Sequence, residues 1–146
     1  MFDIARLAER LVAATRRLQH QPSLGELPIG YFGASTGAAA ALWAAAELGE
    51  EIAAVVSRGG RPDLAAPRLL DVRAPVLLIV GGHDQIVLEL NREAQSLLRG
   101  ASELSVVAGA THLFEEPGAL QEVSRLACEW FQHHLTAAPR RAEART

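Results

Sequence analysis

The chain has 146 residues, of which 49% are hydrophobic and 21% are charged, and its formal net charge is −3. This length fits one domain with a substantial core. The mild acidity argues against a nucleic-acid partner, which usually requires a basic surface, and no apolar run reaches the ~20 residues of a membrane-spanning helix. The single cysteine, Cys128, excludes an intrachain disulfide. Because no signal peptide is visible either, we expect a cytoplasmic protein without a membrane partner.

The first part of the chain alternates between helical and extended patterns. Residues 3–20 place apolar side chains at helical spacing, with Asp3 as the N-cap. The apolar run 27–32 predicts a strand, and the alanine-rich run 36–48 predicts a helix that ends before Gly49. A second strand is predicted at 52–56.

The same alternation continues after a proline-rich loop predicted at 58–74. The run "PVLLIV" at 75–80 predicts a strand that is covered on both faces. A helix at 87–98, a strand at 104–107 and a helix at 116–134 follow, with Pro117 in the first turn of the last helix. Residues 137–146 predict a disordered basic tail, which leaves 1–136 as a single domain.

This alternation predicts an α/β fold with about four parallel strands and helices on both faces of the sheet. In such sheets, ligands bind at the carboxyl ends of the strands. The search for a site therefore reduces to the loops that follow the four predicted strands.

The loop after the first predicted strand has the spacing G-x-S-x-G, Gly33-Ala34-Ser35-Thr36-Gly37, and leads directly into a helix. This is the context of a nucleophile elbow, in which the serine hydroxyl stands clear above the sheet. The helix N-terminus faces the reacting oxygen, so the Thr36 amide is a candidate donor to an oxyanion.

Two further loops supply partners for Ser35. Asp84 lies just after the third predicted strand, and His112 lies in the loop after the fourth. The order Ser, Asp, His is that of the serine triad in α/β-hydrolases. In this hypothesis His112 takes the proton of Ser35, while Asp84 orients His112 and stabilises its charged form.

Each of these residues also has a simpler interpretation. Ser35 and Asp84 are favourable helix N-caps, and His112 is compatible with an exposed loop. His83 is a competing base beside Asp84, but its place in the chain does not match the triad order. Cys128, within the last helix, is interpreted as a small buried hydrophobe.

Arg58 and Arg61, in "SRGGR" after the second strand, are candidates for binding an anionic substrate, and a solvated turn is the alternative. His133 and His134 are adjacent on a helix and do not face each other, so no metal site is expected there. No cofactor is expected.

The chain resembles the carboxyl-terminal part of α/β-hydrolases, and most of all the dienelactone hydrolase branch, in the segments "GYFGASTGAAAAL", "VVSRGG", "APVLLIVGGHDQIV" and "GATHLFEEPGAL". The resemblance covers about residues 28–135 and implies Ser35, Asp84 and His112 as the triad. Dienelactone hydrolases usually carry cysteine at the elbow, whereas this chain has Ser35, which favours an esterase-like serine mechanism.

The resemblance also implies a truncated α/β-hydrolase fold, because only one helix precedes the nucleophile strand here. The part that is missing normally supplies the second oxyanion donor, so only Thr36 carries over. The nucleophile strand, which is central in the family, would then lie at an open sheet edge. We therefore expect a homodimer or a larger homo-oligomer in which a neighbour covers this edge.

The resulting expectation is a serine carboxylesterase. No insertion large enough for a lid lies between the predicted strands, which favours small esters with short acyl chains. Lactone hydrolysis and acyl transfer are variants within the same class. The alternative is a catalytically impaired, hydrolase-like interaction module that associates through its exposed sheet edge.

Overall fold

Four parallel strands form the centre of the computed structural model, which describes residues 3–135. Along the chain the elements are α1 (Ile4–Gln19), β1 (Gly30–Ala34), α2 (Thr36–Leu48), η1 (Gly49–Glu51), β2 (Ala54–Arg58), η2 (Pro62–Asp71), β3 (Val76–Gly81), α3 (Gln85–Leu97), β4 (Ser102–Val107) and α4 (Ala119–His134). The two η elements are 3₁₀-helices.

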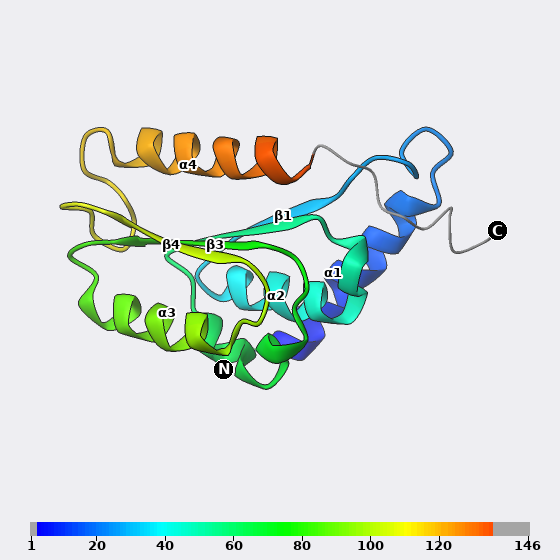
Figure 1. The fold of residues 1–146 in the computed structure, drawn as a ribbon, viewed down its shortest axis with the longest axis horizontal. Helices are drawn as coiled ribbons and strands as arrows, with labels where there is room; N and C mark the ends of the chain where they lie inside the picture. The colour runs from blue at the N-terminus through cyan, green and yellow to red at the C-terminus, as the bar shows by residue number, and fades with distance from the viewer. Residues whose placement is uncertain (1–2, 136–146) are drawn as a thin grey trace.

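The strands are arranged in the order β1-β2-β3-β4, and every neighbouring pair is parallel. Figure 1 shows α4 above one face of the sheet and α1, α2 and α3 on the other. The predicted α/β architecture, with four parallel strands and helices on both faces, is therefore confirmed. Because all four strands run the same way, their carboxyl ends lie together at one end of the sheet.

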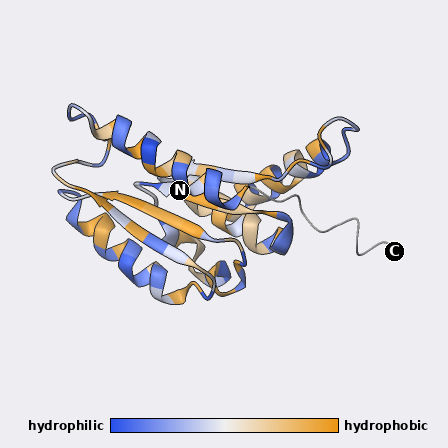
Figure 2. Cartoon of the chain, turned by 45° about the horizontal axis from the view of Figure 1, so that its top comes forward, coloured by the Kyte–Doolittle hydropathy of each residue, from blue (hydrophilic) through white to orange (hydrophobic). Residues whose placement is uncertain are grey.

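Burial follows from this layering. Every residue of β3 is buried, because β3 has a strand on each side and helices on both faces. The alanines of α2 are short enough to let this helix pack closely against α1, η2 and the sheet. Figure 2 shows a mostly hydrophobic sheet and helices whose outward sides are hydrophilic.

The structure corrects several sequence-based boundaries. The last helix begins at Ala119, not at 116, because Gly118 adopts a left-handed conformation with φ +83° immediately before it. Pro117 consequently lies in the loop and not in the first helical turn. The predicted loop 58–74 contains the 3₁₀-helix η2, and β1 and β2 begin two or three residues later than expected.

Cys128 is exposed, so its interpretation as a buried hydrophobe is wrong. The buried residues of α4 are Ala119, Val123 and Ala127, which repeat every four residues along one face. Position 128 is rotated by about 100° from this face by the helical repeat.

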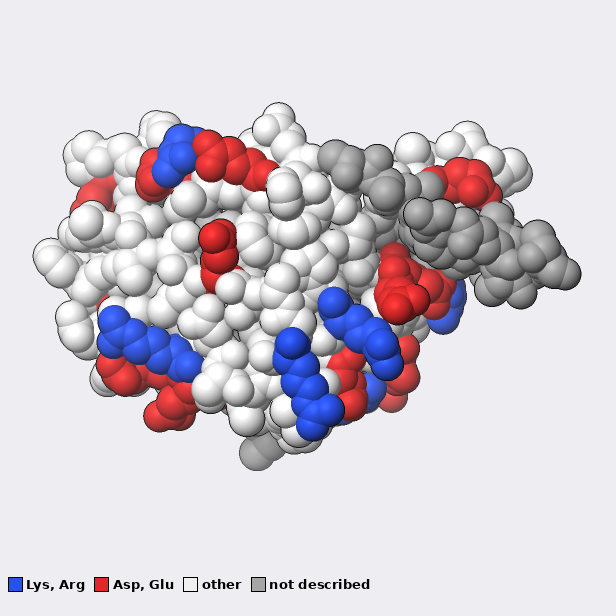
Figure 3. Space-filling view, viewed as in Figure 1, with Lys and Arg blue, Asp and Glu red and all other residues white. Residues whose placement is uncertain are grey.

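Surface charge and helix composition add two further observations. Figure 3 shows acidic and basic side chains interspersed on one face of the molecule, without a large area of a single sign. No helix within residues 3–135 has both the length and the apolarity needed to cross a membrane. The predicted disordered tail, 137–146, lies outside the described residues.

Candidate active site

Three side chains from three loops meet at the carboxyl ends of the strands. Ser35 follows β1, Asp84 is three residues beyond β3, and His112 lies in the loop between β4 and α4. The Oγ atom of Ser35 is 3.1 Å from Nε2 of His112, and Nδ1 of His112 is 2.8 Å from Oδ2 of Asp84. The structure thus brings together the three residues that the sequence motifs single out.

The direction of these hydrogen bonds follows from what each group can donate. A carboxylate only accepts, so Nδ1 of His112 carries the proton and donates it to Asp84. Nε2 then holds a lone pair and accepts a hydrogen bond from the Ser35 hydroxyl. The Asp84 side chain is 15% exposed and that of His112 is 41% exposed, so the acid is shielded while the imidazole remains accessible.

Helix capping does not account for either side chain. Ser35 and Asp84 occupy the N-cap positions of α2 and α3, but neither side chain makes a capping hydrogen bond. Both side chains point to His112 instead. By contrast, Asp3 at the start of α1 does cap its helix, because its carboxylate accepts from the amide of Arg6.

The backbone at Ser35 is strained, with φ +50° and ψ −124°. A non-glycine residue in such a conformation costs on the order of 1–3 kcal/mol and persists only when its surroundings hold it. Gly33 permits the turn, since a Cβ atom there would lie 2.7 Å from Cα of Ala38. Gly37 has no such constraint, because a Cβ atom there would meet nothing within 4 Å.

The loop that carries His112 is fixed by Glu116, which lies in the same loop between β4 and α4 and which no sequence motif singles out. Its carboxylate accepts from both the hydroxyl and the amide of Thr111, the residue before His112. These hydrogen bonds favour the ionised form and lower the pKa of Glu116, the side-chain bond contributing most. Phe114, buried with φ +56°, anchors the other side of the same loop.

The remaining predicted site residues are placed as follows. Thr36 is the first residue of α2, directly after Ser35. The guanidinium of Arg61 forms a bidentate salt bridge with the carboxylate of Asp63, so the charge of Arg61 is already paired. Arg58 lies over the ring of Phe114, 5.4 Å from the ring centre. His83, the competing base, takes no part in the hydrogen bonds between Ser35, His112 and Asp84.

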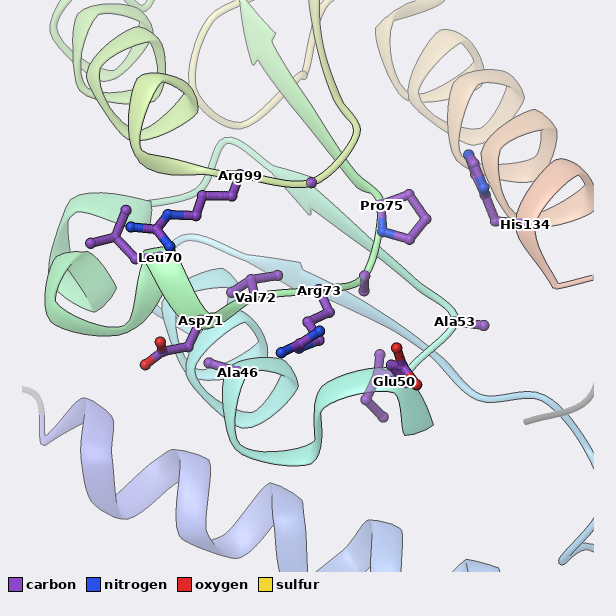
Figure 4. A pocket seen from close by; sticks show the side chains of 13 residues that line it. Ala46, Glu50, Ala53, Leu70, Asp71, Val72, Arg73, Pro75, Arg99 and His134 are labelled. Carbon is purple, nitrogen blue, oxygen red and sulfur yellow. The ribbon is translucent and has the colours of Figure 1, made fainter. Parts of the chain in front are cut away.

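A cavity of about 880 Å³ lies at the other end of the strands, near their amino ends. Ala53, Pro75 and Gly100, which precede strands β2, β3 and β4, contribute to its wall. Figure 4 shows Arg73, Glu50 and His134 among the side chains that line this cavity. It contains none of the three residues discussed above, and it opens at the amino ends of the strands, where ligands of parallel sheets are not usually bound.

Comparison with known proteins identifies the class and then the family. Solved structures of the α/β-hydrolase type share the fold: a monoacylglycerol lipase from Paleococcus ferrophilus aligns over 84% of this chain and 74% of its own, with a TM-score of 0.70 and 20% identity. The model of the dienelactone hydrolase family matches residues 3–137, and the chain therefore belongs to this family.

Two relatives are similar in sequence as well. A dienelactone hydrolase from Anabaena variabilis has a solved structure that is 56% identical, with a TM-score of 0.90, and the match covers 91% of this chain and 62% of that one. A Mycobacterium tuberculosis protein, named provisionally as a phosphoribosyl transferase, is 61% identical over 92% of this chain. The chain spans only 30% of the length of this curated relative.

Proposed function

We propose that this chain carries the active site of a serine carboxylesterase that cleaves small esters through an acyl-enzyme. The observation that carries the proposal is the pair of hydrogen bonds that link Ser35 to His112 and His112 to Asp84. These residues are 77 and 28 positions apart in the sequence. The strained backbone of Ser35 and the family membership support it.

In the proposed reaction, Oγ of Ser35 attacks the ester carbonyl carbon while Nε2 of His112 takes the hydroxyl proton. The tetrahedral intermediate then collapses, the bond to the alcohol oxygen breaks, and His112 returns the proton to the leaving alcohol. Water then attacks the acyl carbonyl carbon while Nε2 of His112 takes its proton. The bond to Oγ breaks, His112 returns the proton to Ser35, and the acid leaves. Asp84 keeps His112 in the required tautomer and stabilises its cation throughout.

The amide of Thr36 at the N-terminus of α2 is the proposed donor to the oxyanion. Loss of one donor from such a site costs on the order of 10²- to 10³-fold in rate. A second hydrogen-bond donor to the oxyanion would therefore raise the rate by about 10²- to 10³-fold. The preference for short acyl chains rests on the absence of a lid-sized insertion between the strands of the described part of the chain.

The test is hydrolysis of p-nitrophenyl acetate and butyrate by the wild type and by Ser35→Ala. Turnover should fall to the uncatalysed background in Ser35→Ala and in His112→Ala. Ser96→Ala is the matched control, because Ser96 is an exposed serine on α3 away from the site. Equal rates in folded wild type and Ser35→Ala would refute the proposal.

The alternative, an interaction module without catalysis, is separated by a fluorophosphonate probe that labels activated serines. Labelling of Ser35 that disappears in His112→Ala supports the esterase, whereas folded protein that resists the probe supports the module. The phosphoribosyl transferase name belongs to a relative that is more than three times as long, and the Ser35–His112–Asp84 arrangement serves acyl transfer chemistry rather than that reaction.

A further inference from the structure

Asn91, the single asparagine of the chain, is fully buried and lies on α3 two turns after Asp84. Its Nδ2 atom donates to the carbonyl oxygens of Gly60, at 3.1 Å, and of Val87, at 2.8 Å. Two carbonyl acceptors on the same side fix the amide orientation, because the opposite orientation would place oxygen against oxygen.

The Gly60 carbonyl belongs to the same peptide group as the amide of Arg61. That amide donates to the carbonyl oxygen of Ser35 at 3.1 Å. One planar peptide unit therefore accepts from Asn91 at one end and donates to the nucleophile residue at the other. Hydrogen bonds connected in this way polarise and strengthen each other.

The surroundings leave this peptide little freedom. A Cβ atom at Gly60 would overlap Oγ of Ser57 and lie 2.6 Å from Cβ of Ala38. The amide of Gly59 donates to the carbonyl of Ile79 at 2.7 Å, which ties the start of the loop to β3. The loop is thus held on both sides at the point where it contacts the strained residue Ser35.

An asparagine at this place carries both a cost and a gain. The Oδ1 atom of Asn91 is buried and has no hydrogen-bond partner among the described residues, which is a cost that leucine of similar size would avoid. What leucine would lack is the donor to Gly60. The useful property of Asn91 is therefore its hold on the peptide between Gly60 and Arg61.

We propose that Asn91 is a positioning residue for the nucleophile, and that it holds the strained backbone of Ser35 through the peptide between Gly60 and Arg61. Helix α3 would then serve the site twice, with Asp84 orienting the base at its N-terminus and Asn91 fixing the nucleophile two turns later. This inference rests on the proposed esterase function for its kinetic consequence, but not for its structural one.

The experiment compares Asn91→Leu and Asn91→Ala with Thr15→Val. Thr15 is a matched control because it is also buried and also loses hydrogen bonds, to Tyr31 and Leu11, in a part of the fold away from the Gly60–Arg61 peptide. The structural readout is the chemical shift and hydrogen exchange of the Arg61 amide in the ¹⁵N-labelled protein. The kinetic readout is kcat and KM for p-nitrophenyl acetate.

Both Asn91 variants should shift the Arg61 amide proton upfield and speed its exchange at least tenfold relative to Thr15→Val. Their kcat should fall by about 10- to 100-fold at little-changed KM, since small misplacement of reacting groups has effects of this size. An Arg61 amide that matches the control in both variants would overturn the proposal. If the wild type itself shows no turnover, the esterase proposal fails, and the amide readout still decides the role of Asn91.

Discussion

Outside the hydrogen-bonded residues Ser35, His112 and Asp84, the residue Glu116 makes a testable contribution to the stability of the His112 loop. Its ionised carboxylate holds both the amide and the hydroxyl of Thr111, and these bonds lower the pKa of Glu116 below its ordinary value. A lowered pKa in the folded state means that the stabilisation is complete above the unfolded-state pKa and is lost as the pH falls through the folded-state pKa. Glu116→Gln should therefore be less stable than wild type at neutral pH, and the difference should shrink in acid.

Urea unfolding at a series of pH values measures this difference. Glu115→Gln is the control, since it removes the same charge from the neighbouring, more exposed position. A stability difference for Glu116→Gln that stays constant from neutral pH down through the acid range would contradict the assigned role of the carboxylate.

The contrast between predicted and missed site residues has a physical basis. Ser35, Asp84 and His112 are found from the sequence because each follows a strand, and the carboxyl ends of parallel strands converge. Asn91 acts through a backbone carbonyl of the loop after β2, and Glu116 acts through the Thr111 amide within its own loop. No spacing rule reports such contacts, because they depend on the path of a loop rather than on the register of a strand.

At the scale of elements, the turn between β1 and α2 makes unequal demands on its two glycines. Gly33→Ala would push a Cβ atom against the backbone of α2, at 2.7 Å from Cα of Ala38, and should cost about 1–3 kcal/mol of stability. Gly37→Ala places its methyl group in open space within α2 and should stabilise the protein by about 0.5–1 kcal/mol, as alanine favours helix.

Thermal or urea unfolding of both variants tests this asymmetry, and p-nitrophenyl acetate hydrolysis shows whether the turn keeps its geometry. Gly37→Ala should retain the wild-type rate. Equal destabilisation by the two substitutions would mean that the motif constrains both positions alike, contrary to the structure.

Element boundaries show where sequence patterns are sufficient. The helix 36–48 is predicted with the observed bounds because an alanine run lies between a serine and a glycine, and both of these adopt positive φ. The start of α4 is missed, since Pro117 is equally suited to a loop or to a first turn and only the conformation of Gly118 decides between them. The start of β1 is set by pairing with Ala54, which no local pattern reveals.

At the scale of the whole molecule, β1 forms one outer edge of the four-stranded sheet. Among the described residues this strand pairs only with β2, so its other edge presents unpaired backbone groups. Phe32 on this strand is 51% exposed, although it is in register with Val56, which belongs to the hydrophobic cluster beneath α4. An apolar, unprotected edge of this kind promotes association between chains.

We expect a second copy of the chain to cover this edge, because a two-fold axis brings two identical strand edges together in antiparallel pairing. Light scattering at micromolar concentration should then give the mass of a dimer or a larger assembly. Phe32→Lys should shift the protein toward monomer, since a charge on an edge strand opposes pairing. Ile86→Lys, which alters a 78% exposed apolar residue on α3, should leave the mass unchanged. A wild type that is monomeric at these concentrations would show that the β1 edge is not a homodimer interface.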